Sequence, residues 1–145
     1  MIVVADSGPL HYLILVGEID LLRQFYGEVR IPLAVERELS SAGAPTQIVE
    51  WIANLPAWVR VETTKESLIP SLMGAGEGEA IALAIALPAD LVLVDDRAGR
   101  NEARRQNLEV TGTLGVLRMA AERGLIDVPE IIARLQATNF YFGED

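Results

Sequence analysis

Short apolar segments alternate with longer amphipathic or apolar stretches along the whole chain. This pattern predicts short strands separated by helices. The predicted strands are residues 2–5, 29–31, 59–61, 91–94 and 108–111. The predicted helices are residues 9–25 with an interruption at Gly17, then 33–39, 46–55, 77–87, 97–106, 114–123 and 128–136. Residues 63–76 follow neither period.

The predicted order indicates an α/β fold with a parallel sheet, because parallel strands need crossover connections that are usually helical. Residues 91–94 are a continuous apolar run, which is typical of a central strand covered on both faces. The helix at 77–87 has an apolar body on every side and should be buried all round. We expect Gly124 to end the helix before it and Asp127 to cap the last helix.

Composition sets limits on class and chemistry. Of the 145 residues, 50% are hydrophobic, and we expect residues 1–145 to form a single domain. The start of the chain has no basic segment of the signal-peptide kind, and the longest apolar run is too short to cross a membrane, so we expect a cytoplasmic protein. The chain has no cysteine and one histidine, His11, which excludes Cys/His zinc sites, disulfides and catalytic thiols.

Charge gives a further limit. The formal net charge is −9, which argues against a protein that coats nucleic acid by bulk positive charge. It does not exclude an enzyme that acts on nucleic acid through a bound cation.

Acidic residues occur where the predicted strands end. Asp6 follows the first strand, Asp95 and Asp96 follow the most apolar one, and Glu79 lies in the first turn of the apolar helix. Ligands of such sheets gather beyond the carboxyl ends of the strands, so these side chains should meet at one edge. Each acid alone could be a helix cap or a helix-start acid. Together, Asp6, Glu79 and Asp96 favour a shared divalent cation, and oxygen ligands select Mg²⁺ or Mn²⁺.

Arginines follow these acids. Arg97, Arg100 and Arg104 share one face of the predicted helix, while Arg105 points elsewhere. The strip could contact phosphates beside a metal site, or it could be a solvated face that balances nearby acids.

Several stretches carry a resemblance to a known family. They are VADSGPL at 4–10, IPLAVEREL at 31–39, GEGEAIALA at 76–84 leading to LVDDR at 93–97, and TGTLGVL at 111–117. In this order and spacing the chain resembles PIN-domain proteins, the fold of VapC-type toxin nucleases. The stretch at 111–117, with Gly124-Leu125-Ile126 after it, resembles one uncharacterised PIN subgroup.

The resemblance implies a three-layer α/β/α fold with a central parallel sheet and a Mg²⁺- or Mn²⁺-dependent endoribonuclease. The acids that match the family's catalytic, metal-binding set by position are Asp6, Glu38, Glu79 and Asp96, with Asp95 as a further metal ligand. Glu36 competes with Glu38 for the second position, and helical spacing alone does not decide between them. Many relatives have Ser or Thr where Gly8 stands, so Ser7 is the candidate hydroxyl. Possible substrate contacts are Ser7, Arg97, Arg100 and Thr113.

The resemblance also implies partners. Relatives of the toxin group dimerise and bind a small antitoxin protein, so we expect a homodimer and an antitoxin beside an RNA substrate. Two other functions compete with this one. A PIN scaffold that no longer cuts would serve as a binding or regulatory module. A response-regulator receiver is disfavoured, because its acid pair follows the first strand and its lysine lies downstream, whereas here Lys65 precedes Asp95.

Overall fold

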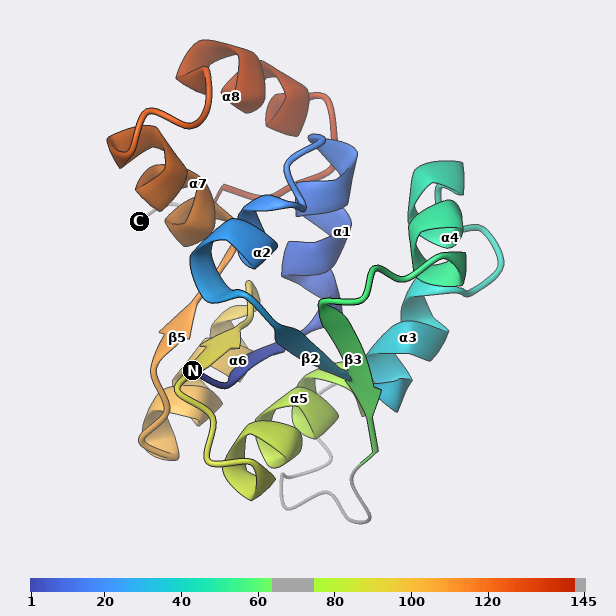
Figure 1. Ribbon diagram of the computed structural model, residues 1–145, viewed down its shortest axis with the longest axis vertical. Helices are drawn as coiled ribbons and strands as arrows, with labels where there is room; N and C mark the ends of the chain where they lie inside the picture. The colour runs from blue at the N-terminus through green and yellow to red at the C-terminus, as the bar shows by residue number, and fades with distance from the viewer. Residues whose placement is uncertain (64–74, 143–145) are drawn as a thin grey trace.

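The fold is a central parallel sheet between layers of helices (Figure 1). The computed structural model describes residues 1–63 and 75–142, with only the backbone of 75–77. Within these residues the sheet contains β1 (Val3–Ala5), β2 (Val29–Pro32), β3 (Val59–Glu62), β4 (Leu91–Leu93) and β5 (Val110–Thr111). The helices there are α1 (Ser7–Leu15), α2 (Leu21–Tyr26), α3 (Leu33–Leu39), α4 (Thr46–Ala53), α5 (Ala75–Ala86), α6 (Arg97–Arg105), α7 (Thr113–Glu122) and α8 (Val128–Gln136).

Alternating side chains of the central strands face two separate apolar cores. Val3 and Ala5 of β1 pack into a core with residues of α1 to α4, α7 and α8. Val4, between them, joins Val92 and the buried face of α5 on the other side. A sheet covered on both faces produces this division, because successive strand residues point to opposite faces. The predicted three-layer α/β/α fold is confirmed.

The strand order places the start of the chain at the centre. The order is β3-β2-β1-β4-β5, and every pairing is parallel. The chain moves outward from β1 to β3, then returns through α5 to β4 on the other side of β1. The direction therefore reverses between β1 and β4. In open α/β sheets, ligands bind outside the carboxyl ends of the strands at this switch point.

Most predicted elements are confirmed with shifted ends. The helix predicted at 9–25 is two helices, separated by a turn in which Gly17 has φ +78. The strand predicted at 108–111 is shorter, Val110–Thr111. Helix α5 begins two residues before the predicted start, so Glu79 lies beyond its first turn, and Ala86 at its end is exposed. Most of 63–76, the stretch without a pattern, lies outside the described residues.

Both predicted helix-end signals are confirmed. Gly124 follows α7 with φ +68, a conformation that glycine adopts without steric cost. The Asp127 side chain accepts a hydrogen bond from the Glu130 backbone N–H at 3.2 Å and caps α8.

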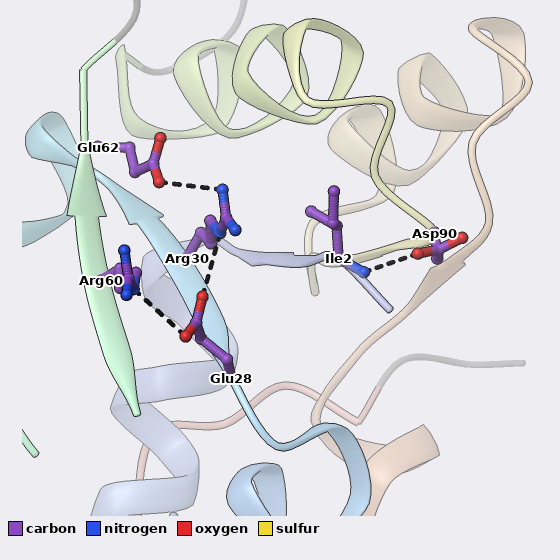
Figure 2. Close-up of polar contacts among 6 residues, drawn as sticks. All are labelled: Ile2, Glu28, Arg30, Arg60, Glu62 and Asp90. Atoms are coloured by element: carbon purple, nitrogen blue, oxygen red, sulfur yellow. Dashed lines mark hydrogen bonds and ion pairs between the residues drawn. The ribbon is translucent and has the colours of Figure 1, made fainter. Parts of the chain in front are cut away.

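A charged ladder crosses β2 and β3 (Figure 2). Arg30 and Arg60 are register partners, so two like charges stand side by side. Glu28 contacts both, 3.4 Å from Arg30 and 3.2 Å from Arg60, and Glu62 lies 3.1 Å from Arg30. The glutamates offset a repulsion that would otherwise weaken the strand pair. These partly exposed pairs make one face of β2 and β3 polar, while Val4 and Val92 carry the apolar contacts with α5 on that side of the sheet.

No helix in the described part of the chain combines the length and the apolar character that crossing a membrane requires.

Candidate active site at the carboxyl edge of the sheet

Asp6 lies at the switch point between the two central strands. Ala5 and Leu93 are register partners, and the Asp6 backbone N–H donates to the Leu93 carbonyl at 2.9 Å. The residue is only 4% exposed. It occupies the N-cap position of α1, yet its side chain makes no capping hydrogen bond. Helix capping therefore does not explain why an acid stands here.

Asp95 lies at the same edge and is held by the start of α7. Its Oδ1 accepts a hydrogen bond from the Thr113 backbone N–H, and its Oδ2 accepts one from the Thr113 hydroxyl, both at 2.7 Å. Burial raises the pKa of Asp95, while the bonds from Thr113 and the charge of Arg100 act in the opposite direction. Through these two hydrogen bonds, the Asp95 carboxylate fixes the start of α7 against the end of β4.

Two glycines make room for Asp95. A Cβ at Gly112 would collide with Asp95 Oδ1 and approach the Val94 carbonyl oxygen to 3.0 Å. A Cβ at Gly8 would lie 3.3 Å from Asp95 Oδ2. At Gly8, where the resemblance implies a hydroxyl residue, this chain therefore brings its backbone close to a partly buried carboxylate.

The structure gives other roles to two of the expected substrate contacts. Thr113 is fully buried, and its hydroxyl donates to Asp95, so it offers no surface to a phosphate. Arg100 is half-buried and its Nε donates to the Val94 carbonyl at 3.0 Å. Arg97 and Arg104 are exposed on α6, and Arg105 pairs with Glu102 at 3.4 Å. Of the expected strip of three arginines, Arg100 makes a structural contact with the backbone, while Arg97 and Arg104 are exposed.

Asp96 caps the next helix. Its Oδ2 accepts a hydrogen bond from the Gly99 backbone N–H at 2.9 Å, and the residue is exposed. The capping interpretation is correct for Asp96. The cap uses one oxygen of this carboxylate, so capping and ion binding are compatible.

Glu38 lies across a cavity from the start of α1. This cavity, about 450 Å³, is bordered by Ser7 and Gly8 on one side and by Glu38 on the other. Glu36 is not among its lining residues, so position in the fold favours Glu38 in that competition. Glu79 is half-buried in α5, which packs against α3 and β1.

A second cavity, about 490 Å³, is lined by Arg104 and residues 107–110. It lies where β5 begins, at the end of the sheet opposite to Asp6. Its position separates it from the acids described above.

The expected metal ligands share one edge but do not converge. Among residues 1–63 and 75–142, no group of three or more acidic or histidine side chains is close enough together to hold a metal ion. The donor set fits a hard cation chemically, since every candidate is a carboxylate and Asp6 is buried at the switch point. Thr113 already binds both oxygens of Asp95, each of which keeps a second lone pair. The metal site stays a prediction that rests on Asp6, Glu38, Glu79 and Asp96, with Asp95 as a further ligand.

Sequence reasoning missed the residues that build the cavity beside Glu38. His11 and Tyr12 stand one helical turn after Ser7 and Gly8, and their half-buried rings line the cavity. Asn139, beyond α8, closes it and accepts a hydrogen bond from the Tyr12 hydroxyl at 2.9 Å. His11 follows Ser7 by four residues, so the two lie on one face of α1. No pattern in the sequence predicted that Asn139 lies here, because it is 127 residues from Tyr12.

Comparisons with known proteins agree with this fold. Residues 2–145 match a family model, DUF3368, that is described as a PIN domain. A search of the curated proteins found no match. Among solved structures, the chain is similar to a PilT N-terminus domain protein from the hyperthermophilic archaeon Sulfolobus solfataricus. The TM-score is 0.60 at 16% identity, over 83% of this chain and 93% of that one, which is a likeness of fold.

Proposed function

Since this chain belongs to the PIN-domain family, we propose that it is a metal-dependent endoribonuclease that hydrolyses RNA phosphodiester bonds. The observation that carries the proposal is the position of Asp6. It is an acid buried to 4% exposure at the point where the strand order reverses, and its side chain does not cap the helix that it precedes. Burying a carboxylate is costly, and the ligands of open α/β sheets bind at this switch point, so an acid at this place is suited to hold a cation.

In this proposal Asp6, Glu38, Glu79 and Asp96 hold Mg²⁺ or Mn²⁺. When bound, such an ion lowers the pKa of a water molecule and stabilises the charge that develops on a phosphodiester. The four acids come from four elements or their ends: the end of β1, α3, α5 and the end of β4. Because they do not converge among the described residues, side-chain movements would accompany binding.

The neighbouring residues position the acids and the RNA. Asp95 fixes the segment after β4 through Thr113, and Asp96 follows it directly, at the same edge of the sheet as Asp6. The Ser7 hydroxyl and the exposed Arg97 guanidinium lie at the same edge and are suited to contact a phosphate. With a net charge of −9, the protein would hold RNA through these few contacts and not through bulk charge.

The proposal is tested by cleavage of total RNA with and without Mn²⁺. We expect cleavage by the wild type only when the cation is present, and none by Asp6→Asn. A matched control is Asp20→Asn, which removes an equal charge where Asp20 pairs with Arg23 on the surface. Circular dichroism spectra should be the same for all three proteins. Cleavage by Asp6→Asn at the wild-type rate would refute the role of Asp6.

A second candidate is a PIN-fold module that binds and does not cut. The observation that favours it is that no three acids approach ligating distance in the described part of the chain. Calorimetry with Mn²⁺ separates the two candidates, because a non-catalytic module would bind no ion at the edge and Asp6→Asn would not change the titration.

The toxin role is a finer form of the first candidate. In that form the chain is the toxin of a toxin–antitoxin pair, forms a homodimer and is silenced by a small antitoxin protein. Growth arrest on expression, abolished by Asp6→Asn, would support it. Light scattering would measure the oligomeric state independently.

A further inference from the structure

Three groups of residues line the cavity beside Glu38. One wall is a face of α1, from which the half-buried rings of His11 and Tyr12 project. The floor is apolar and consists of Leu39 and Ile48, which are 3% and 0% exposed. Residues 41–45 and the exposed Asn139 form the rim. Its volume of about 450 Å³ lies in the usual range for small-ligand sites.

The polar groups at the rim can still form hydrogen bonds. The Asn139 Oδ1 accepts from the Tyr12 hydroxyl, and its amide nitrogen makes no hydrogen bond to any residue of 1–63 or 75–142. The Ser41 hydroxyl donates to the Glu38 carbonyl at 2.8 Å and keeps its lone pairs as acceptors. A donor and an acceptor therefore line the same cavity as two rings and two apolar side chains.

This combination suits a nucleobase. Proteins recognise single-stranded RNA by stacking splayed bases on aromatic side chains, including histidine, and by hydrogen bonding to the base edges. A phosphate or a carboxylate fits less well, because Glu38 is one wall of the cavity and the whole chain carries −9.

We propose that this cavity binds one unstacked base of the RNA next to the bond that is cut, with His11 as the stacking surface and Asn139 as the group that reads the base edge. The inference rests on the proposed nuclease function, since Ser7 follows the catalytic Asp6 and lines the cavity. A base held here places its phosphate at the acidic edge, so the cavity sets the sequence preference of cleavage.

Nucleotide binding tests the site without any cleavage. The four ribonucleoside monophosphates are titrated into isotope-labelled protein with EDTA present, followed by NMR. The ring signals of His11 are unambiguous because the chain has one histidine. We expect saturable shifts of the His11 ring and of the Asn139 side-chain amide with at least one of the four nucleotides. If none of them shifts these signals at millimolar concentration, the proposal is wrong.

Variants assign the contacts. His11→Ala and His11→Gln should each weaken binding roughly five-fold or more, as loss of a base–aromatic stack does. His11→Gln keeps a polar side chain of similar length, so it guards against a packing effect. Asn139→Ala changes an exposed residue and should weaken binding or change which nucleotide binds best, while Asn101→Ala on the surface of α6 should do neither. Unchanged affinity in the His11 and Asn139 variants would overturn the assignment.

Cleavage separates this inference from the function on which it rests. If wild-type protein cuts RNA with a base preference that His11→Gln and Asn139→Ala relax, both proposals stand. If it cuts without preference and these variants cut alike, the base site fails and the nuclease stands. If it does not cut but binds nucleotides through His11, the cavity is a nucleotide site on a non-catalytic module, and the nuclease fails.

Discussion

Asp95 and Thr113 form a two-point contact between the end of β4 and the start of α7. The Thr113 backbone N–H donates to Oδ1 of the carboxylate and its hydroxyl donates to Oδ2, each at 2.7 Å. These residues are 18 positions apart, so the contact closes the loop that contains α6 and β5. It also ties α7, which packs into the core on the face opposite to α5, to the end of β4.

The Thr113 hydroxyl should contribute measurably to stability. Thr113→Val keeps the shape of the side chain and the backbone N–H bond but removes the hydroxyl donor. A hydrogen bond to a charged group contributes about 1.5–3 kcal/mol, so we expect a loss of about 2 kcal/mol in the free energy of unfolding. Urea denaturation measures it. At the exposed start of α4, Thr46→Val should change stability by less than about 0.5 kcal/mol. Equal losses in the two variants would contradict the role of the contact.

The pKa of Asp95 predicts a pH dependence. Burial raises the pKa of Asp95 in the folded protein above its ordinary value of 3.8. Between pH 3.8 and this raised pKa, the folded protein therefore binds more protons than the unfolded chain. The stability from this carboxyl is fully present below pH 3.8 and is lost as pH rises through the raised pKa. Asp95→Asn should therefore show a smaller loss of stability than the wild type over this rise in pH. Urea denaturation in EDTA at several pH values tests this, and parallel curves for the two proteins would show that the pKa is not raised.

The two glycines beside Asp95 should respond differently to alanine. At Gly112 a Cβ would collide with the carboxylate and approach the Val94 carbonyl. We therefore expect Gly112→Ala to cost about 1–3 kcal/mol. At Gly8 the nearest atom would be 3.3 Å away. Alanine also gains up to about 1 kcal/mol of helix propensity in α1, so Gly8→Ala should change stability by less than about 1 kcal/mol. Thermal or urea unfolding of both variants gives the comparison, and a larger loss at Gly8 would contradict it.

The sequence predicted the sheet well because its signals are local. The continuous apolar run at 91–94 and the acids that follow Ala5 and Val94 need no partner to be recognised. The use of Asp95 could not be predicted, since a carboxylate that binds a metal and one that binds a distant threonine look alike in sequence. Strand order was also hidden: the pairing of β1 with β4 depends on which face the chain crosses after β3.

The cavity was the part of the site that local patterns could not give. It joins α1 to residues 41–45 and to Asn139, which come together only when α8 has packed against α1. His11 gave no functional signal by itself, because a lone histidine at this spacing is as well suited to a helix surface. Its proposed role depends on Glu38 and Asn139, which line the same cavity and come from distant parts of the chain.

The titration of His11 tests where Glu38 lies. Burial lowers the pKa of His11 below 6.5, and the charge of Glu38 acts in the opposite direction. Glu38→Gln should therefore lower this pKa further. Glu36→Gln, on the same helix but outside the cavity lining, should leave it close to the wild-type value. NMR titration of the single histidine in EDTA measures both variants.

The same titration has a consequence for stability. Between its lowered pKa and 6.5, His11 binds fewer protons in the folded protein than in the unfolded chain. Its contribution to the free energy of unfolding is therefore present above pH 6.5 and is lost as pH falls through the lowered pKa. Glu38→Gln should enlarge this loss, as judged against its own stability at pH 7.5, whereas Glu36→Gln should not. A larger effect of Glu36→Gln on either measurement would place Glu36 at the cavity and transfer to it the metal-binding role proposed for Glu38.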